Sequence, residues 1–139
     1  MWFRRRRARR NDLTHIRGEV HRILETVDAA TTSRDPKSLA QALAGDALAE
    51  IHARLDAYVL AGISVHPFRE DLHVVSSAPV EDDRLRVWLR YRDRTSFLPE
   101  RGPALTADDP VELLLLVDTG LDPWRAVSIM ETEADPGPS

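Results

Sequence analysis

The sequence contains no cysteine, few aromatic residues and no long apolar run. Without cysteine, disulfide bonds and thiolate chemistry are excluded. No segment approaches the roughly 20 consecutive apolar residues that a membrane-spanning helix needs. The basic start is followed by no apolar stretch of the kind found in secretory signals, so we expect none. The 6 glycines are scattered, which leaves no Gly-rich loop to bind phosphate.

The residues that are present have the composition of a single globular domain. Hydrophobic residues make up 42% and charged residues 30% of the 139-residue chain, enough for a core and too few charges for a disordered chain. The charge is unevenly distributed, because six arginines and no acids lie within the first ten residues. Removing those six charges from the net charge of −4 leaves −10 for residues 11–139. The chain is therefore a cationic tag attached to an acidic body.

The cationic tag, residues 1–10, is expected to lie outside the folded domain because its like charges repel one another. Its candidate contacts to a membrane or polyanion are Trp2, Phe3, Arg4, Arg5, Arg6, Arg7, Arg9 and Arg10. Aromatic rings favour the headgroup level of a bilayer, and arginines are attracted to an anionic surface. The same side chains could contact nucleic acid or simply keep the terminus soluble. Nucleic acid is the least favoured partner because the body is acidic.

Helical spacing dominates the first half of the domain. An apolar stripe recurs at intervals of three and four residues and predicts a helix from a cap at Asn11 or Asp12 to about Ala30. Its members are Leu13, Ile16, Val20, Ile23 and Val27. After a loop at 31–34, Asp35 and Pro36 are suited to begin a short helix that stops at Gly45.

A further helix is expected over residues 47–61. Asp46 is its predicted N-cap and Gly62 is suited to end it. Its apolar face is expected to carry Leu48, Ile51, Leu55 and Val59.

After Gly62 the apolar period changes from helical to extended. We expect a short strand at 63–65, a strand at 72–80, a turn at 81–83 and a long strand at 84–97. A Pro-rich connection at 98–110 then leads to a hairpin, with strands at 111–117 and 124–130 and a turn at 118–123. Residues 133–139 are expected to be a disordered tail.

The alternation of apolar and polar residues is clearest in the strand that begins at residue 84. One face carries Leu85, Val87, Leu89 and Tyr91, and the other carries the candidate interface residues Arg84, Arg86, Trp88, Arg90 and Arg92. Guanidinium groups beside an indole could bind a partner's acidic segment or pair with carboxylates such as Glu112 or Glu131. An exposed tryptophan favours an interface, with a protein partner or a second copy of the chain.

This order of elements, together with four short segments, resembles the NTF2-like superfamily and within it the Tim44-like domains. The segments are residues 43–48 at the helix break, 72–75, 86–89 and 123–129. The resemblance covers residues 11–132. It implies a single α+β domain in which N-terminal helices pack on a curved, mainly antiparallel sheet and leave a concave pocket.

The resemblance implies two kinds of function. Tim44-like domains act as membrane-associated tethers or scaffolds. Other members are enzymes of the ketosteroid isomerase or polyketide cyclase type, with Asp or His in the pocket. In this sequence His73 and Asp93 are the candidates for that role, and Asp93 is expected to be paired with Arg90, Arg92 or Arg94. Alternation is expected to separate Tyr91 from Asp93.

We therefore expect a non-enzymatic binding or scaffolding domain without cofactor, cytoplasmic and peripheral at the membrane if the tag contacts lipid. Nothing in the sequence has the spacing of a metal site. The alternative is a small-molecule isomerase, dehydratase or cyclase that binds its ligand in the pocket. A pocket with a buried acid–base pair favours the enzyme, and a filled or apolar pocket favours the scaffold.

Overall fold

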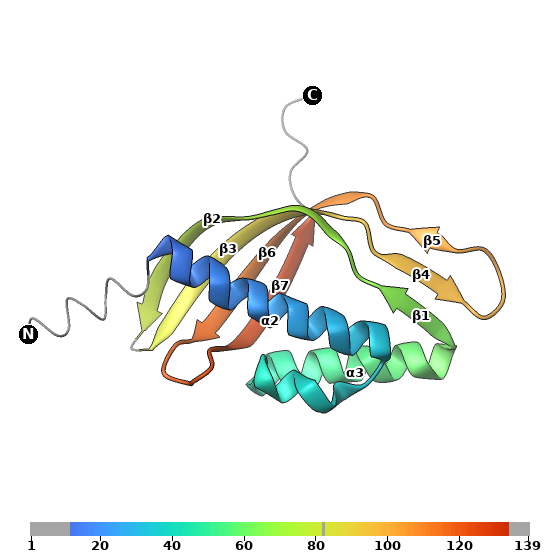
Figure 1. Cartoon of the computed structure of the whole chain (residues 1–139), viewed down its shortest axis with the longest axis horizontal. Coiled ribbons are helices and arrows are strands. Elements are labelled where there is room, and N and C mark those ends of the chain that lie inside the picture. Colours follow the sequence, from blue (N-terminus) through green and yellow to red (C-terminus); the bar gives the residue numbers. More distant parts are fainter. Residues whose placement is uncertain (1–11, 82, 134–139) are drawn as a thin grey trace, which may run out of the picture.

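The computed structural model describes residues 12–81 and 83–133. The cationic tag at 1–10 and residues 134–139 of the expected tail (133–139) lie outside these residues, whereas Glu133 belongs to the last strand. The described elements form a curved antiparallel sheet with helices packed against one of its faces (Figure 1). The predicted α+β class is thereby confirmed.

Three helical segments come first in the described part of the chain: α2 (Leu13–Ser33), the 3₁₀ helix η1 (Pro36–Gln41) and α3 (Gly45–Ala61). Asp12 caps α2 as predicted, since its carboxylate accepts a hydrogen bond from the His15 amide at 2.9 Å. Asp35 likewise caps η1, and Gly62 ends α3 in the left-handed conformation (φ +68°).

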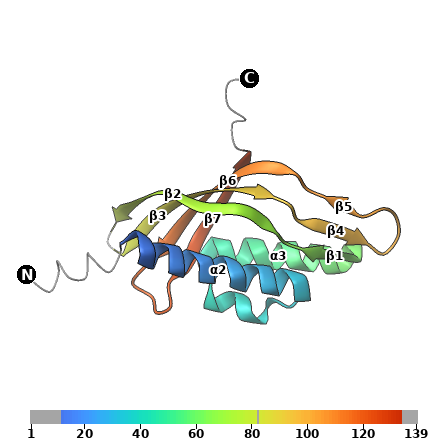
Figure 2. The same cartoon turned by 45° about the horizontal axis from the view of Figure 1, so that its top comes forward.

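The remaining elements are strands in two sheets. The larger sheet has the order β2 (Arg69–Glu81), β3 (Arg84–Asp93), β6 (Asp109–Asp118), β7 (Arg125–Glu133). The smaller one has the order β1 (Ile63–His66), β4 (Ser96–Pro99), β5 (Leu105–Thr106). Every pair of neighbouring named strands is antiparallel, and β6 and β7 form the predicted C-terminal hairpin. Both long helices lie along the same side of the larger sheet (Figure 2).

The core lies between the sheet and α2. All four inward residues expected on β3 are buried, at 7% exposure or less, and they face the apolar stripe of α2. The inward residues of β6 continue this layer: Val111, Leu113, Leu115 and Val117. Each such side chain contributes roughly 1.5–3 kcal/mol to folding when fully buried, so this layer is the main source of stability.

Arg22 ties the helical layer to the sheet. Its guanidinium donates to the backbone carbonyl of Gln41 at 3.1 Å and to that of Trp124. Its Nε also bonds Glu19 within the same helix. One side chain of α2 thus fixes both η1 and the start of β7.

Three boundary predictions and one burial prediction were wrong. Helix α2 continues through the expected loop to Ser33, and α3 begins at Gly45, which was expected to end the preceding helix. The long strand ends at Asp93, because the Asp93 carboxylate accepts a hydrogen bond from the Thr95 amide and turns the chain into the other sheet. Val59, expected to pack inward, is 53% exposed.

Candidate functional site

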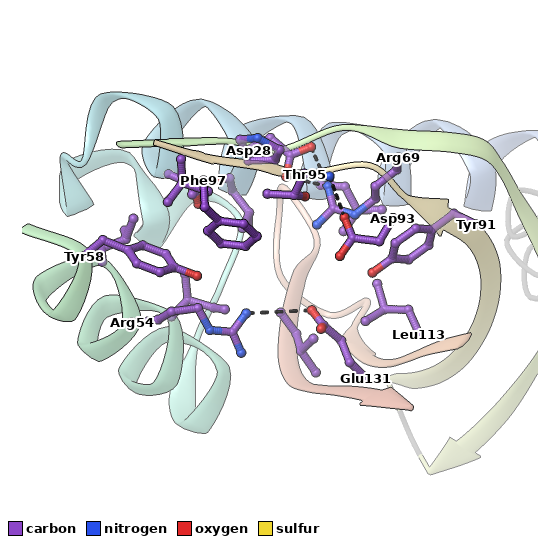
Figure 3. Close-up of a pocket in the computed structure, with 18 residues that line it drawn as sticks. Asp28, Arg54, Tyr58, Arg69, Tyr91, Asp93, Thr95, Phe97, Leu113 and Glu131 are labelled. Carbon is purple, nitrogen blue, oxygen red and sulfur yellow. Dashed lines mark hydrogen bonds and ion pairs between the residues drawn. The ribbon is translucent and has the colours of Figure 1, made fainter. Parts of the chain in front are cut away.

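A cavity of about 140 Å³ lies at the end of the core, enclosed by α2, α3 and strands of both sheets. Its walls combine aromatic rings with charged groups, and Figure 3 shows these side chains converging from several elements. The polar and aromatic lining residues are Asp28, Thr31, Arg54, Tyr58, Arg69, Tyr91, Asp93, Thr95, Phe97 and Glu131. The volume is below the roughly 300–1,000 Å³ of drug-sized ligand pockets.

The inner wall holds an ion pair between α2 and β2. One nitrogen of Arg69 contacts both carboxylate oxygens of Asp28, and the Arg69 guanidinium carbon lies 5.4 Å from the centre of the Tyr91 ring. Burial raises the pKa of Asp28, against the opposing effect of Arg69. Burial, with the nearby charge of Glu131, raises the pKa of Tyr91 to about 12. The Tyr91 phenol is therefore neutral and able to donate a hydrogen bond.

Asp93 lies beside Tyr91, on the same face of β3. The expectation that alternation separates these two residues was wrong, since positions two apart share a face of a strand. The neighbouring arginines of Asp93 form ion pairs with other carboxylates: Arg90 with Glu112, Arg92 with Asp108 and Arg94 with Glu70. The expected pairing of Asp93 with these arginines is therefore wrong for all three.

The opening of the cavity is formed by α3 and β7. Arg54 lies 3.7 Å from Glu131 and 3.5 Å from Glu50, and the side chains of Arg54 and Glu131 are 41% and 44% exposed. The Tyr58 and Phe97 rings meet beside this pair, with centroids 6.3 Å apart (Figure 3). The outer ion pair is thus long and solvated, whereas the inner pair is tight.

His73 is not among the residues that line this cavity. It is exposed on β2, and its Nδ1 lies 3.0 Å from the backbone oxygen of Asp71. Asp71 has positive φ (57°), and the register of β2 against β3 shifts between Glu70 and His73. The structure therefore brings Asp93 into the cavity and does not place His73 with it.

Most of the polar residues of the cavity were missed by sequence reasoning. Two of them carried a usable signal. Asp28 follows Leu24 by four residues and so continues the inner stripe of α2, and Glu131 follows Ile129 by two on β7. Arg69 and Arg54 carried none, because their roles depend on partners distant in sequence.

The opposite face of the larger sheet carries the candidate interface. Trp88 is 39% exposed, and its Nε1 donates to Glu112 at 3.2 Å. Glu112 also accepts from Arg90, which is the predicted pairing, whereas Glu131 pairs with Arg54 instead of with this row. Arg84 lies 3.9 Å from Asp118. No ion pair of Arg86 occurs within residues 12–81 and 83–133.

Neither a metal centre nor a membrane span is found in the described part of the chain. No group of three or more His, Asp or Glu side chains there is arranged to hold a metal ion. None of the described helices combines the length and the apolar character that crossing a bilayer demands.

Solved structures share this fold at low sequence identity. The intermembrane space region of the chloroplast protein ARC6 superposes with a TM-score of 0.79 at 15% identity, over 88% of this chain and 98% of that chain. A putative aromatic ring hydroxylase from Novosphingobium aromaticivorans gives 0.65 at 13% identity, over 86% and 90%. Aln2 from a Streptomyces species gives 0.58 at 12% identity, over 85% and 90%.

These neighbours share the arrangement of helices packed against a curved antiparallel sheet, so the predicted fold is confirmed. No protein-family model and no curated protein sequence matches the chain. At 12–15% identity these structures show the fold alone, and one fold can host unrelated functions.

Proposed function

We propose that this domain is a non-enzymatic binding domain, similar in role to the Tim44-like scaffolds, that docks an acidic segment of a partner protein on its exposed sheet face. The observation that carries the proposal is Trp88. A large indole is held by a hydrogen bond in the middle of a sheet face that no described helix covers. Tryptophan and arginine are the residues most enriched at the energetic centre of protein interfaces.

The residues around Trp88 form an apolar row across three strands. Trp88 pairs in register with Leu114 on β6, which pairs with Met130 on β7, and Met130 is 56% exposed. Arg86 flanks this row on the same face of β3 and has no ion pair among the described residues. An apolar row beside such a cation fits a partner segment that carries both apolar and acidic side chains.

The state of the cavity also supports a binding role. Asp28 is paired with Arg69, Glu131 contacts Arg54, and Asp93 accepts the Thr95 amide. No histidine lines the cavity among the described residues. A general base must be able to reach a substrate proton, and the Asp28 carboxylate is held by Arg69 and is not free to do so.

A photo-crosslinking amino acid at position 130, in the same row as Trp88, tests the proposal in the cells that produce the protein. We expect a protein adduct from position 130, none from the 90%-exposed Leu60 on α3, and loss of the adduct when Arg86→Glu is added. An adduct with a second copy of the chain would show that this face forms a homodimer and does not dock a different protein. Adducts of equal yield from both positions, or from neither, would refute docking at this face.

We further propose that the tag holds the domain against an anionic membrane, a role resting on the sequence alone. Co-flotation with anionic and neutral liposomes tests it. We expect the full chain to float with anionic lipid only, and a variant with the six tag arginines changed to glutamine to stay in solution. Equal flotation of both proteins would contradict the proposal.

A further inference from the structure

The cavity carries more negative than positive charge. Three carboxylates and two guanidinium groups line it, which gives a net charge of −1. An adjoining hollow is lined by Asp93, Asp109 and Glu131 and by no cationic residue among those described. The cross-strand partners of Asp93 are Asp109 on β6, a like charge, and Arg69 on β2, which is already paired with Asp28. Negative potential is therefore concentrated where the two spaces meet.

The two cations of the cavity differ in how firmly they are held. Arg69 is fixed by its double contact with Asp28 and is 16% exposed. Arg54 makes only long contacts to two glutamates, one on its own helix and one across the opening. Arg54 can leave Glu131 and keep Glu50, which would free the Glu131 carboxylate for another cation.

Aromatic groups surround this negative region. The Tyr58 and Phe97 rings form a corner on one side of it. On the other side the Tyr91 side chain, 7% exposed, directs its hydroxyl toward the Asp93 carboxylate (Figure 3). Aromatic faces combined with carboxylates are the means by which proteins bind alkylated ammonium groups.

The size of the space limits the ligand. At about 140 Å³ the cavity is close to the roughly 150 Å³ of an engineered protein cavity that holds benzene. A guest of that kind has about six non-hydrogen atoms. A small tetraalkylammonium ion fits this limit, whereas a nucleotide or a steroid does not.

We propose that the cavity binds a small organic ammonium ion, whose charge is met by Asp93 and Glu131 and whose alkyl groups contact Tyr58, Phe97 and Tyr91. Entry of the ion displaces Arg54 from Glu131 toward Glu50. This site is on the helical side of the sheet, so it goes beyond the docking role proposed for the outer face.

Calorimetric titration of the full chain with choline tests the charge requirement. Its matched control is 3,3-dimethylbutan-1-ol, which has the same shape without the charge. We expect choline to bind at least about tenfold more tightly than the alcohol, the range expected for a charge-assisted contact. Equal binding of the two, or no binding of choline, would overturn the proposal.

Two substitutions of cavity residues are expected to act in opposite directions. Asp93→Asn keeps the acceptor for the Thr95 amide but removes the charge, so choline affinity should fall about tenfold. Arg54→Ala removes the competing cation, so choline affinity should rise. A fall in affinity for Arg54→Ala, with tight binding of the carboxylate 3,3-dimethylbutanoate to the wild type, would show an anion site instead.

The same ammonium group can come from a free metabolite or from a methylated lysine of a protein. We assign the free amine, because the limited volume leaves little room for a peptide backbone. Titration with Nα-acetyl-trimethyllysine amide separates the two sources. Weaker binding than choline supports the free amine, and tighter binding overturns that assignment.

Discussion

Replacing Arg69 by methionine should expose how much the inner ion pair of the cavity contributes to folding. The substitution keeps the apolar stem and removes the guanidinium, which leaves the half-buried carboxylate of Asp28 without its partner. Breaking a fully buried pair costs about 3–5 kcal/mol. Because the Asp28 side chain is 29% exposed, we expect about 2–4 kcal/mol here. In a chain of this length that corresponds to a fall in Tm of roughly 5–15 °C.

The loss should depend on pH in a defined direction. Burial raises the pKa of Asp28 and Arg69 opposes the increase, so removing Arg69 raises that pKa further. An acid with a raised folded-state pKa contributes stability that is present at low pH and lost as pH rises through that pKa. Urea unfolding should therefore show a smaller loss for Arg69→Met at pH 5 than at pH 7.

The double variant Asp28→Asn/Arg69→Met is the control, because no unpaired buried charge remains in it. It should recover at least half of the stability that the single variant loses at pH 7. A loss below about 1 kcal/mol for Arg69→Met, an equal loss at both pH values, or a double variant no more stable than the single one would each refute this account of the pair.

Two further predictions concern Tyr91 and Arg22. The pKa of Tyr91 is raised from 10.0 to about 12, so the folded state favours the neutral phenol and loses stability as pH rises through that window. Tyr91→Phe should show a smaller fall in the urea midpoint between pH 9.5 and pH 11.5 than the wild type, and equal falls would contradict the assignment. Arg22→Met leaves the carbonyls of Gln41 and Trp124 without their donor, so thermal unfolding should show a loss of about 1–3 kcal/mol. The exposed Arg17→Met on the same helix should change stability by less than about 0.5 kcal/mol, and similar losses at both positions would refute the role of Arg22.

The fold was predictable because its signals are local. The stripe of α2, the cap at Asp12, the alternation of β3 and the apolar hairpin each follow from spacing within a few residues, and all four are found in the structure. The failures depend on contacts between distant segments. The end of β3 at Asp93 requires the chain to turn into a second sheet, which no spacing within β3 predicts.

The candidate site was less predictable for a related reason. The expectation that Tyr91 and Asp93 are separated was wrong because residues two apart on a strand share a face. That shared face places both residues in the cavity. The orientation of His73 could not have been extrapolated, because a positive φ at Asp71 and a shift of register precede it on β2. The alternation of side chains between the two faces of a strand predicts their orientation only where the strand is not interrupted.

Strand β3 explains why one domain of this size offers two separate surfaces. Its inward residues are apolar from Leu85 to Leu89 and become polar at Tyr91 and Asp93, where the core gives way to the cavity. Its outward residues meet no helix, and Trp88 lies among them. The change of polarity on one face and the uncovered indole on the other are independent features of the same strand.

Substitution of Trp88 should therefore leave ligand binding in the cavity unchanged, and substitution of Asp93 should leave docking on the sheet face unchanged. If substitution of Trp88 changed ligand binding, or substitution of Asp93 changed docking, β3 would have to move as a unit between two states. The cavity and the sheet face would then be one coupled site.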